Sequence, residues 1–235
     1  IGYYQFIEKL EKDFDQRKDE TVEELRKLMK EILRPENFMI SYTGEKESLE
    51  TVKKLAASVK AELCTEPAEK SKDKLICTKK NEGFKTSGQV QYVAQTGNFK
   101  KKGLEYTGAL EILKVILSYD YLWINLRVKG GAYGCMSGFG TYGDSYLVSY
   151  RDPNLKETND IYEGIPAYLE AFDPDERDMT KYVIGTISNL DAPLTPSVKG
   201  SRGLSAYLSG VTEEMMQTER DQILGAAKED IRALA

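Results

Sequence analysis

Histidine is absent from this chain of 235 residues, which removes a common metal ligand and the side chain most often used for general acid–base catalysis. Only three cysteines are present, Cys64, Cys77 and Cys135. Three scattered thiols without histidine make a poor tetrahedral zinc set, and their small, odd number is typical of reduced thiols. The sequence therefore predicts no metal site within this chain.

Long apolar runs are also missing. No stretch of 18 or more apolar residues occurs, so we predict no membrane-spanning segment. The first residues lack the basic-then-apolar pattern of a signal peptide, and there is no initiator Met, so we expect a piece of something longer. The net charge of −5 argues against nucleic acid as a main partner, because phosphate binding depends on clustered cations.

Enough apolar residues are present, 40% of the chain, to build a core. Residues 1–35 carry apolar side chains at helical spacing and are interpreted as a helical lead-in, the end of a preceding domain or a linker. Thr21 and Glu24 form a capping box, so a second helix is expected to start there and stop before Pro35. Residues 36–235 are predicted to form one further domain.

Strand and helix patterns alternate through that domain. Alternating or β-prone stretches predict strands, and apolar residues at 3.6 spacing predict helices. The predicted strands are 37–43, 83–86, 89–95, 132–139 and 145–150. The predicted helices are 47–62, 107–126, 154–172 with a kink at Pro166, and one beginning near Asp175. This order predicts an α/β or α+β fold in two layers, one sheet with helices packed against it.

The segment from Asn125 to Gly134 is the candidate functional site. An apolar helix ends on Arg127, breaks at Gly130-Gly131, and is followed by Tyr133 entering a strand. Arginine donates in a fixed fork, a tyrosine hydroxyl also donates, and backbone approaches a ligand closely at glycine. We interpret Arg127 and Tyr133 as a grip on a peptide carbonyl or a developing oxyanion. The backbone of Gly130, Gly131 and Ala132 is expected to contact substrate. Tyrosines near a sheet also serve as packing residues, so the residues alone leave a structural role open.

Two further motifs have structural interpretations. Gly138–Gly143 matches G-x-G-x-x-G, but a strand rather than a helix follows it, so it is interpreted as a hairpin turn and not a dinucleotide site. Arg151-Asp152-Pro153-Asn154 is interpreted as a strand end and a helix start. Asp152 or Asn154 is expected to cap the helix, with Arg151 as a surface partner.

Leu126–Gly134, followed by Ser149–Leu155, resembles the last domain of the pitrilysin/insulinase metallopeptidases and is most similar to their presequence-protease branch. Supporting similarity lies in Tyr92–Ala94, Gly97–Phe99, Asp191–Leu194, Lys199-Gly200 and Gly210–Glu214. The resemblance covers about residue 37 to the end. It implies a two-layer α+β domain with a mostly antiparallel sheet and helices on one face.

The resemblance also implies a function. Members of the family enclose a chamber between two halves and degrade unfolded peptides, with zinc held in the first domain by H-x-x-E-H and a distal glutamate. The last domain supplies an arginine and a tyrosine that hold substrate and stabilise the tetrahedral intermediate; by position these are Arg127 and Tyr133. Because this chain lacks H-x-x-E-H, zinc is expected outside it, and the chain is expected to be inactive alone.

The implied partners are the zinc-bearing N-terminal half and peptide substrates. Arg127 and Tyr133 are expected to be exposed on a partly apolar chamber wall through which copies self-associate, with the later helices on the opposite sheet face. The implied compartment is the cytoplasm of a bacterium or an organelle matrix of a eukaryote. Two alternatives remain: a non-catalytic relative that acts as scaffold or peptide-binding subunit, and an unrelated peptide-binding module. The presence of both Arg127 and Tyr133 favours the catalytic line.

Overall fold

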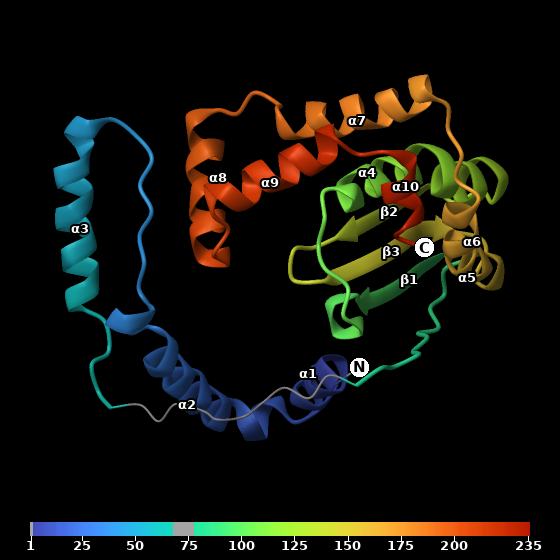
Figure 1. Cartoon of the computed structure of the whole chain (residues 1–235). Helices are drawn as coiled ribbons and strands as arrows, with labels where there is room; N and C mark the ends of the chain where they lie inside the picture. Colours follow the sequence, from blue (N-terminus) through green and yellow to red (C-terminus); the bar gives the residue numbers. More distant parts are fainter. Residues whose placement is uncertain (1, 68–77) are drawn as a thin grey trace. The chain divides into compact units, whose positions relative to one another are not determined.

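The computed structural model describes residues 2–67 and 78–235 (Figure 1). The chain divides into two compact units. The first comprises residues 1–81 and 194–204, and the second comprises residues 82–193 and 205–235. The predicted boundary between a helical lead-in of residues 1–35 and a domain of residues 36–235 stays a prediction.

The first unit is helical in the part that is described. It contains α1 (Gly2–Lys12), α2 (Phe14–Ile32), the short turns η1 (Pro35–Asn37) and η2 (Lys46–Ser48), and α3 (Leu49–Ala61). None of the three helices has a buried residue, although each carries an apolar stripe. Two predictions were wrong here: α2 runs through Thr21 without a break, and residues 38–43 form no strand.

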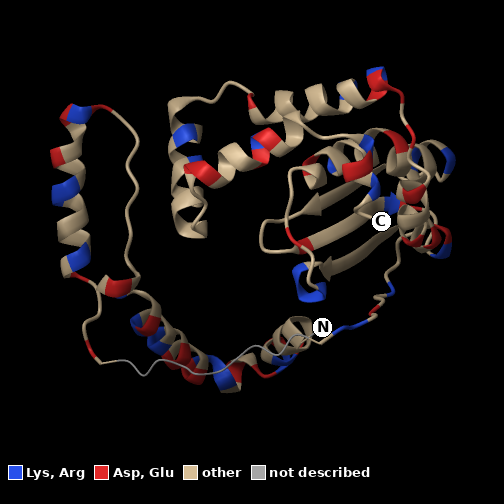
Figure 2. Cartoon of the chain, viewed as in Figure 1, with Lys and Arg blue, Asp and Glu red and all other residues tan. Residues whose placement is uncertain are grey.

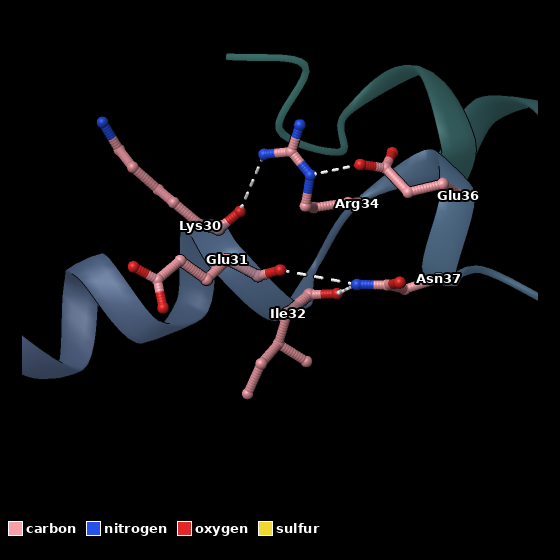
Figure 3. Close-up of polar contacts among 6 residues, drawn as sticks. All are labelled: Lys30, Glu31, Ile32, Arg34, Glu36 and Asn37. Atoms are coloured by element: carbon pink, nitrogen blue, oxygen red, sulfur yellow. Dashed lines mark hydrogen bonds and ion pairs between the residues drawn. The ribbon is translucent and has the colours of Figure 1, made fainter. Parts of the chain in front are cut away.

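The predicted stop before Pro35 is confirmed, and polar side chains hold it in place (Figure 3). The Asn37 amide donates to the carbonyl of Ile32 at 3.1 Å, and Arg34 donates to that of Lys30 at 3.4 Å. Arg34 also pairs with Glu36 at 2.5 Å. The last carbonyls of a helix have no partner within it, so these donors satisfy groups that the helix leaves open.

The second unit is built on a three-stranded antiparallel sheet. Its strands are β1 (Gln91–Asn98), β2 (Gly134–Phe139) and β3 (Asp144–Asp152), in the spatial order β1-β3-β2 (Figure 1). The predicted 132–139/145–150 hairpin is therefore confirmed, and β1 confirms the strand predicted at 89–95. The predicted strand at 83–86 is wrong, because those residues are irregular. The predicted mixed α/β fold with an antiparallel sheet is confirmed.

Helices cover one face of this sheet. After η3 (Lys100–Lys102), α4 (Ala109–Ile116) continues into two π-helical segments, η4 (Leu117–Tyr121) and η5 (Trp123–Lys129), and both of these contact β2. α5 (Lys156–Glu163) packs against β1. The remaining helices of the unit are α6 (Ile165–Glu170), α7 (Glu176–Leu190), α9 (Glu213–Leu224) and α10 (Lys228–Arg232). α8 (Pro196–Ser209) spans the sequence boundary between the units.

The core lies between the sheet and these helices. The stripe predicted from helical spacing is buried, namely Leu110, Leu113, Ile116 and Leu117. Ile112, Leu122 and Leu126 of the same long helix are buried as well, and Val93 of β1 belongs to the same core. α7 differs from expectation in one respect, because its main contacts are with α4 and α9 rather than with the sheet. The helices thus form the expected layer with α7 added outside it.

Helix boundaries in this unit follow the local sequence. Asp175 is the N-cap of α7, and its carboxylate accepts the backbone N–H of Asp178 at 2.8 Å. The predicted kink near Pro166 is confirmed as a break at Gly164 between α5 and α6. Pro166 has no backbone N–H, so it fits the first turn of the new helix.

Among the residues that the structure describes, no helix combines the length and hydropathy needed to cross a bilayer. Cys64 and Cys135 form no disulfide, and Cys77 lies outside the described residues.

Candidate functional site

The arginine of the predicted site is presented by a widened helix end. Within η5, Leu126 is buried to 1% exposure and fixes the segment on the core, whereas Arg127 is exposed. The Arg127 Cζ lies 4.3 Å from the centroid of the Trp123 ring, one turn earlier. π-helical turns are rare and occur frequently at functional sites. The widened turn stacks the guanidinium on an aromatic face, which orients it and leaves its donors open to solvent.

The two glycines after the helix are sterically required. A Cβ on Gly130 would stand 2.6 Å from the carbonyl oxygen of Leu126, and Gly131 has a φ of +79°. The turn closes through hydrogen bonds from Gly131 N to Arg127 O at 3.1 Å and from Ala132 N to Leu126 O at 2.9 Å. Ala132 is 3% exposed, so its side chain is not offered to a ligand. The substrate-binding role predicted for residues 130–132 stays a prediction, and for Ala132 it is restricted to the main chain.

The Asp152–Asn154 segment holds the same turn from the sheet side. The Asn154 amide donates to the carbonyl of Gly130 at 2.6 Å. Fully buried Asp152 accepts from Ser149 at 2.5 Å, Thr158 at 2.7 Å and the backbone N–H of Asn154 at 2.8 Å. The predicted capping role was wrong, because α5 follows Leu155 without a side-chain cap bond. These polar residues fix the strand end and the glycine turn instead.

Tyr133 is exposed and lies beside the arginine. The residue is 58% exposed, and its ring centroid lies 5.8 Å from the Arg127 Cζ and 5.7 Å from the Arg151 Cζ. The Tyr150 ring packs edge-on at 5.5 Å, and the backbone N–H of Tyr133 donates to the Tyr150 carbonyl at 3.2 Å. The predicted exposure and juxtaposition of Arg127 and Tyr133 are therefore confirmed. Their chemical roles stay predictions.

The sheet face next to Tyr133 is uncovered and aromatic. Each row across the sheet joins one residue of β1, one of β3 and one of β2; the rows are Tyr92–Tyr150–Gly134, Ala94–Val148–Met136 and Thr96–Tyr146–Gly138. Tyr92 is 73% exposed, and the rings of Tyr150 and Tyr146 lie over Gly134 and Gly138, where a Cβ would clash. Charged residues occur only at the ends of β3 (Figure 2). This face presents aromatic rings and open strand edges to a ligand.

Gly138–Gly143 has the structural role predicted for it. The segment ends β2 and turns into β3, and Gly143 takes a φ of +90° there. No helix follows these glycines, so the geometry of a dinucleotide site is not formed.

The charges at the site are unbalanced. Within the part of the chain that the structure describes, neither Arg127 nor Arg151 makes an ion pair or a side-chain hydrogen bond, and no group of three or more metal-ligating side chains is positioned to hold a metal ion. The described residues therefore do not fit zinc. Burial raises the pKa of the Cys135 thiol, and the nearby Arg127 charge partly offsets this. The site is thus cationic and supplies donors, without a base of its own.

Hollows elsewhere on the surface do not compete with this site. Two, of about 740 and 510 Å³, lie along α7 and share residues such as Asp175, Glu176 and Thr180. None of their lining residues belongs to the arginine–tyrosine cluster, which consists of Arg127, Tyr133 and Arg151.

Comparison with known proteins decides the family. The family model of the PreP C-terminal domain matches residues 81–235. The chain belongs to the PreP C-terminal domain family. The match contains the whole arginine–tyrosine cluster and all three strands of the sheet. The predicted resemblance is thereby confirmed.

Two relatives match this chain over its full length. "Protein HypA" of Clostridium perfringens is 43% identical over 235 residues, which are 100% of this chain and 24% of that protein. "Presequence protease 1, chloroplastic/mitochondrial" of Arabidopsis thaliana is 33% identical over 242 residues, which cover 100% of this chain and 22% of that protein. The chain thus spans about a quarter of the length of these relatives.

A solved structure shares the fold. The peptidase M16 inactive domain from Pseudomonas fluorescens superposes with a TM-score of 0.52 at 17% sequence identity, covering 79% of this chain and 47% of that chain. At this low sequence identity the similarity shows that the two chains share a fold, and nothing further.

Sequence reasoning missed Arg151 as a member of the cluster. Strand alternation places Tyr146, Val148 and Tyr150 on the outer face, so residue 151 should face inward. Burying an arginine without a carboxylate partner costs free energy. The conflict between this cost and the strand alternation is the sequence signal that Arg151 faces outward. Trp123 was also missed, because helical spacing does not distinguish a normal turn from the π-helical one that stacks it under Arg127.

Proposed function

We propose that this chain is the C-terminal part of a longer zinc-dependent peptidase that degrades unfolded peptides. In this proposal Arg127 and Tyr133 hold the scissile peptide and stabilise the oxyanion, and zinc is bound by residues outside this chain. The observation that carries the proposal is the exposed, rigidly held Arg127–Tyr133 pair at the border of an uncharged aromatic sheet face, within a family whose named relatives include presequence proteases.

The two side chains are suited to a carbonyl oxygen. A peptide carbonyl gains negative charge when a nucleophile adds to its carbon, and preorganised donors aimed at that oxygen lower the barrier. The Arg127 fork and the Tyr133 hydroxyl can both donate hydrogen bonds, and among the described residues neither group is engaged in a side-chain hydrogen bond. A water-activating group belongs to the rest of the longer protein in this proposal, because the described residues provide neither histidine nor a metal-binding cluster.

The aromatic face suits an extended, unfolded chain. Strand edges bind peptides through main-chain hydrogen bonds, and tyrosine rings pack on varied side chains without demanding one sequence. A folded protein does not present an extended segment, so the proposed substrates are peptides without stable structure.

The proposal is tested with an unstructured quenched-fluorescence peptide, comparing the longer protein that contains this chain with the chain by itself. We expect the longer protein to cleave the peptide and a chelator to stop it. The chain alone should show no cleavage and no stoichiometric zinc on metal analysis. Cleavage with stoichiometric zinc in the chain alone contradicts the proposal. Peptide binding without cleavage by the longer protein would support the scaffold or peptide-binding alternative instead.

A further inference from the structure

Arg151 occupies a β-bulge at the end of β3. Tyr92 of β1 pairs with Tyr150, and the next residue back, Gln91, pairs with Asp152, so Arg151 is an extra residue without a partner in the ladder. Its φ is +48°, and it is the only non-glycine residue with positive φ among those described. Glycine is the residue normally found in this left-handed conformation, because other side chains crowd the backbone there. An arginine in this place is held against a local preference.

The buried carboxylate of Asp152 explains how the bulge is held. Its three hydrogen bonds, from Ser149, Thr158 and the backbone of Asn154, turn residue 152 into the core. Tyr150 faces outward in the regular pattern. The extra residue between them is therefore directed to the outer face, where the Arg151 guanidinium reaches Tyr133. Bulges next to active sites re-aim side chains in this way.

With Arg151 in this position, two guanidinium groups lie beside the ring of Tyr133. The Cζ atoms of Arg151 and Arg127 lie 5.7 and 5.8 Å from the Tyr133 centroid. In the described part of the chain no carboxylate pairs with either arginine. Each guanidinium lies within 6 Å of the same ring centroid and has no carboxylate partner in that part of the chain, so an anion bound at this ring is attracted by both charges. The planar fork of arginine matches the two oxygens of a carboxylate.

The surroundings favour a carboxylate on a peptide over a polyanion. The adjoining sheet face is uncharged and aromatic, with no track of further cations along it. The chain carries a net charge of −5, which opposes binding of nucleic acid. A single negative charge on an otherwise apolar, extended ligand fits both features.

We propose that Arg151 is a further substrate-binding residue. Its guanidinium donates to a carboxylate of the peptide, either an acidic side chain or the C-terminal group, beside the bond held by Arg127 and Tyr133. This inference rests on the proposed function and adds a substrate preference to it. It assigns the bulge to specificity and leaves the oxyanion contacts to the other two residues.

The kinetic test uses the longer protein and four versions of one unstructured quenched peptide, carrying either Glu or Gln near the cleaved bond and either a free or an amidated C-terminus. We expect kcat/KM to be about 10-fold or more higher for one carboxylate version, since charge-assisted hydrogen bonds have that size of effect. Comparison of the four peptides identifies which carboxylate is bound. Arg151→Gln should bring the ratio of kcat/KM between the carboxylate and the uncharged peptide to about 1, whereas Arg177→Gln on α7, the matched control, should keep the wild-type ratio.

A second variant separates binding from folding. Arg151→Gly suits the positive φ, so it should melt at the same or a higher temperature than the wild type while losing the carboxylate preference. If Arg151 had only a structural role, Arg151→Gly would instead lower the melting temperature. A wild-type protein that cleaves all four peptides equally overturns the inference and leaves the proposed function standing.

A binding readout in the chain itself is independent of cleavage. Trp123 is the only tryptophan, and its ring lies 4.3 Å from the Arg127 Cζ, so its fluorescence reports on the cluster. Titration with the preferred carboxylate peptide should saturate about 10-fold more tightly for wild type than for Arg151→Gln. Equal binding by the two proteins, or tighter binding of a single-stranded oligonucleotide, overturns the inference. A longer protein that cleaves none of the peptides would overturn the proposed function, and this titration would still decide the carboxylate site.

Discussion

Gly130 and Gly131 set the distance between the two side chains of the proposed site. A methyl group at Gly130 would meet the carbonyl oxygens of Leu126 at 2.6 Å and Asn125 at 2.9 Å, both of which are backbone atoms within the helix end. Backbone cannot move aside as a side chain can, so the turn itself must shift. A shift there moves Arg127 and Tyr133 relative to each other.

We therefore expect Gly130→Ala to lower the free energy of unfolding of the chain by about 1–3 kcal/mol, the usual cost of overpacking. Urea unfolding measures this change. Gly185→Ala within α7 is the matched control, because a Cβ there meets only the side chain of Val115 in α4, at an ordinary 3.6 Å. That control should raise stability by about 0.5–1 kcal/mol through helix propensity. Equal stability of Gly130→Ala and wild type would show that the glycine is not needed for the turn.

At the same scale, the sequence predicted that Arg127 and Tyr133 lie together, but it did not predict that Arg151 lies beside them. Arg127 and Tyr133 are recognisable because a helix, a glycine break and a strand follow one another in the sequence. Arg151 joins them through a bulge that depends on the buried contacts of Asp152 with Ser149 and Thr158. Such a contact set is a tertiary property, and strand alternation alone gives the wrong face.

Helices α9 and α10 are tied to the ends of α7 by ion pairs. Arg220 of α9 holds Asp191 through two hydrogen bonds, of 2.6 and 2.8 Å, and Asp173 pairs with Lys228 at 2.6 Å and Arg232 at 3.0 Å. The hydrogen bond from Arg220 is the main cause of a lowered pKa at Asp191, and the one from Lys228 has the same effect at Asp173. Both carboxylates are surface groups, so each pair contributes modestly.

The pH dependence follows from the sign of these shifts. A carboxylate whose pKa is lower in the folded state stabilises the fold above its unfolded value, which is 3.8 for these groups, and that contribution is lost as the pH falls through the folded pKa. Arg220→Met should therefore destabilise the chain at neutral pH, and the difference from wild type should shrink as the pH falls below 3.8 and through the lowered folded pKa of Asp191. Thermal unfolding across that range measures it, with Arg177→Met as control. A difference that does not change with pH would assign the effect of Arg220 to packing.

The elements that the sequence predicted best are those whose pattern is satisfied within one unit. The α4 stripe, the β2–β3 hairpin and the break near Pro166 depend on neighbouring sequence and on one continuous core. The predicted strand at 37–43 failed because alternation indicates a strand-like surface and not a partner. Within the described part of its unit there is no other strand with which it can pair. The predicted helix start at Thr21 failed because the residues before it are themselves good helix formers, so no N-cap conformation arises.

At the scale of the whole molecule, many apolar side chains of the described residues are exposed. α1, α2 and α3 have no buried residue, and the sheet face with Tyr92, Tyr133 and Met136 is open. The relatives that match over the full chain are about four times its length. In the proposed function the remainder of the longer protein faces this surface, and the self-association of isolated chains stays a prediction that follows from the same exposure.

The measurement that tests the central claim most directly is the kcat and KM of the longer protein with Arg127→Ala and with Tyr133→Phe. Among the described residues, the Tyr133 hydroxyl makes no hydrogen bond, so Tyr133→Phe removes a donor without removing a contact of the fold. Each variant should lower kcat by about 10²–10³-fold with a smaller change in KM, because donors aimed at an oxyanion act mainly in the transition state. Bound zinc should be unchanged, and Tyr119→Phe, at an exposed tyrosine of η4, should behave as wild type. Near-normal turnover in both site variants would contradict the account and make the pair structural.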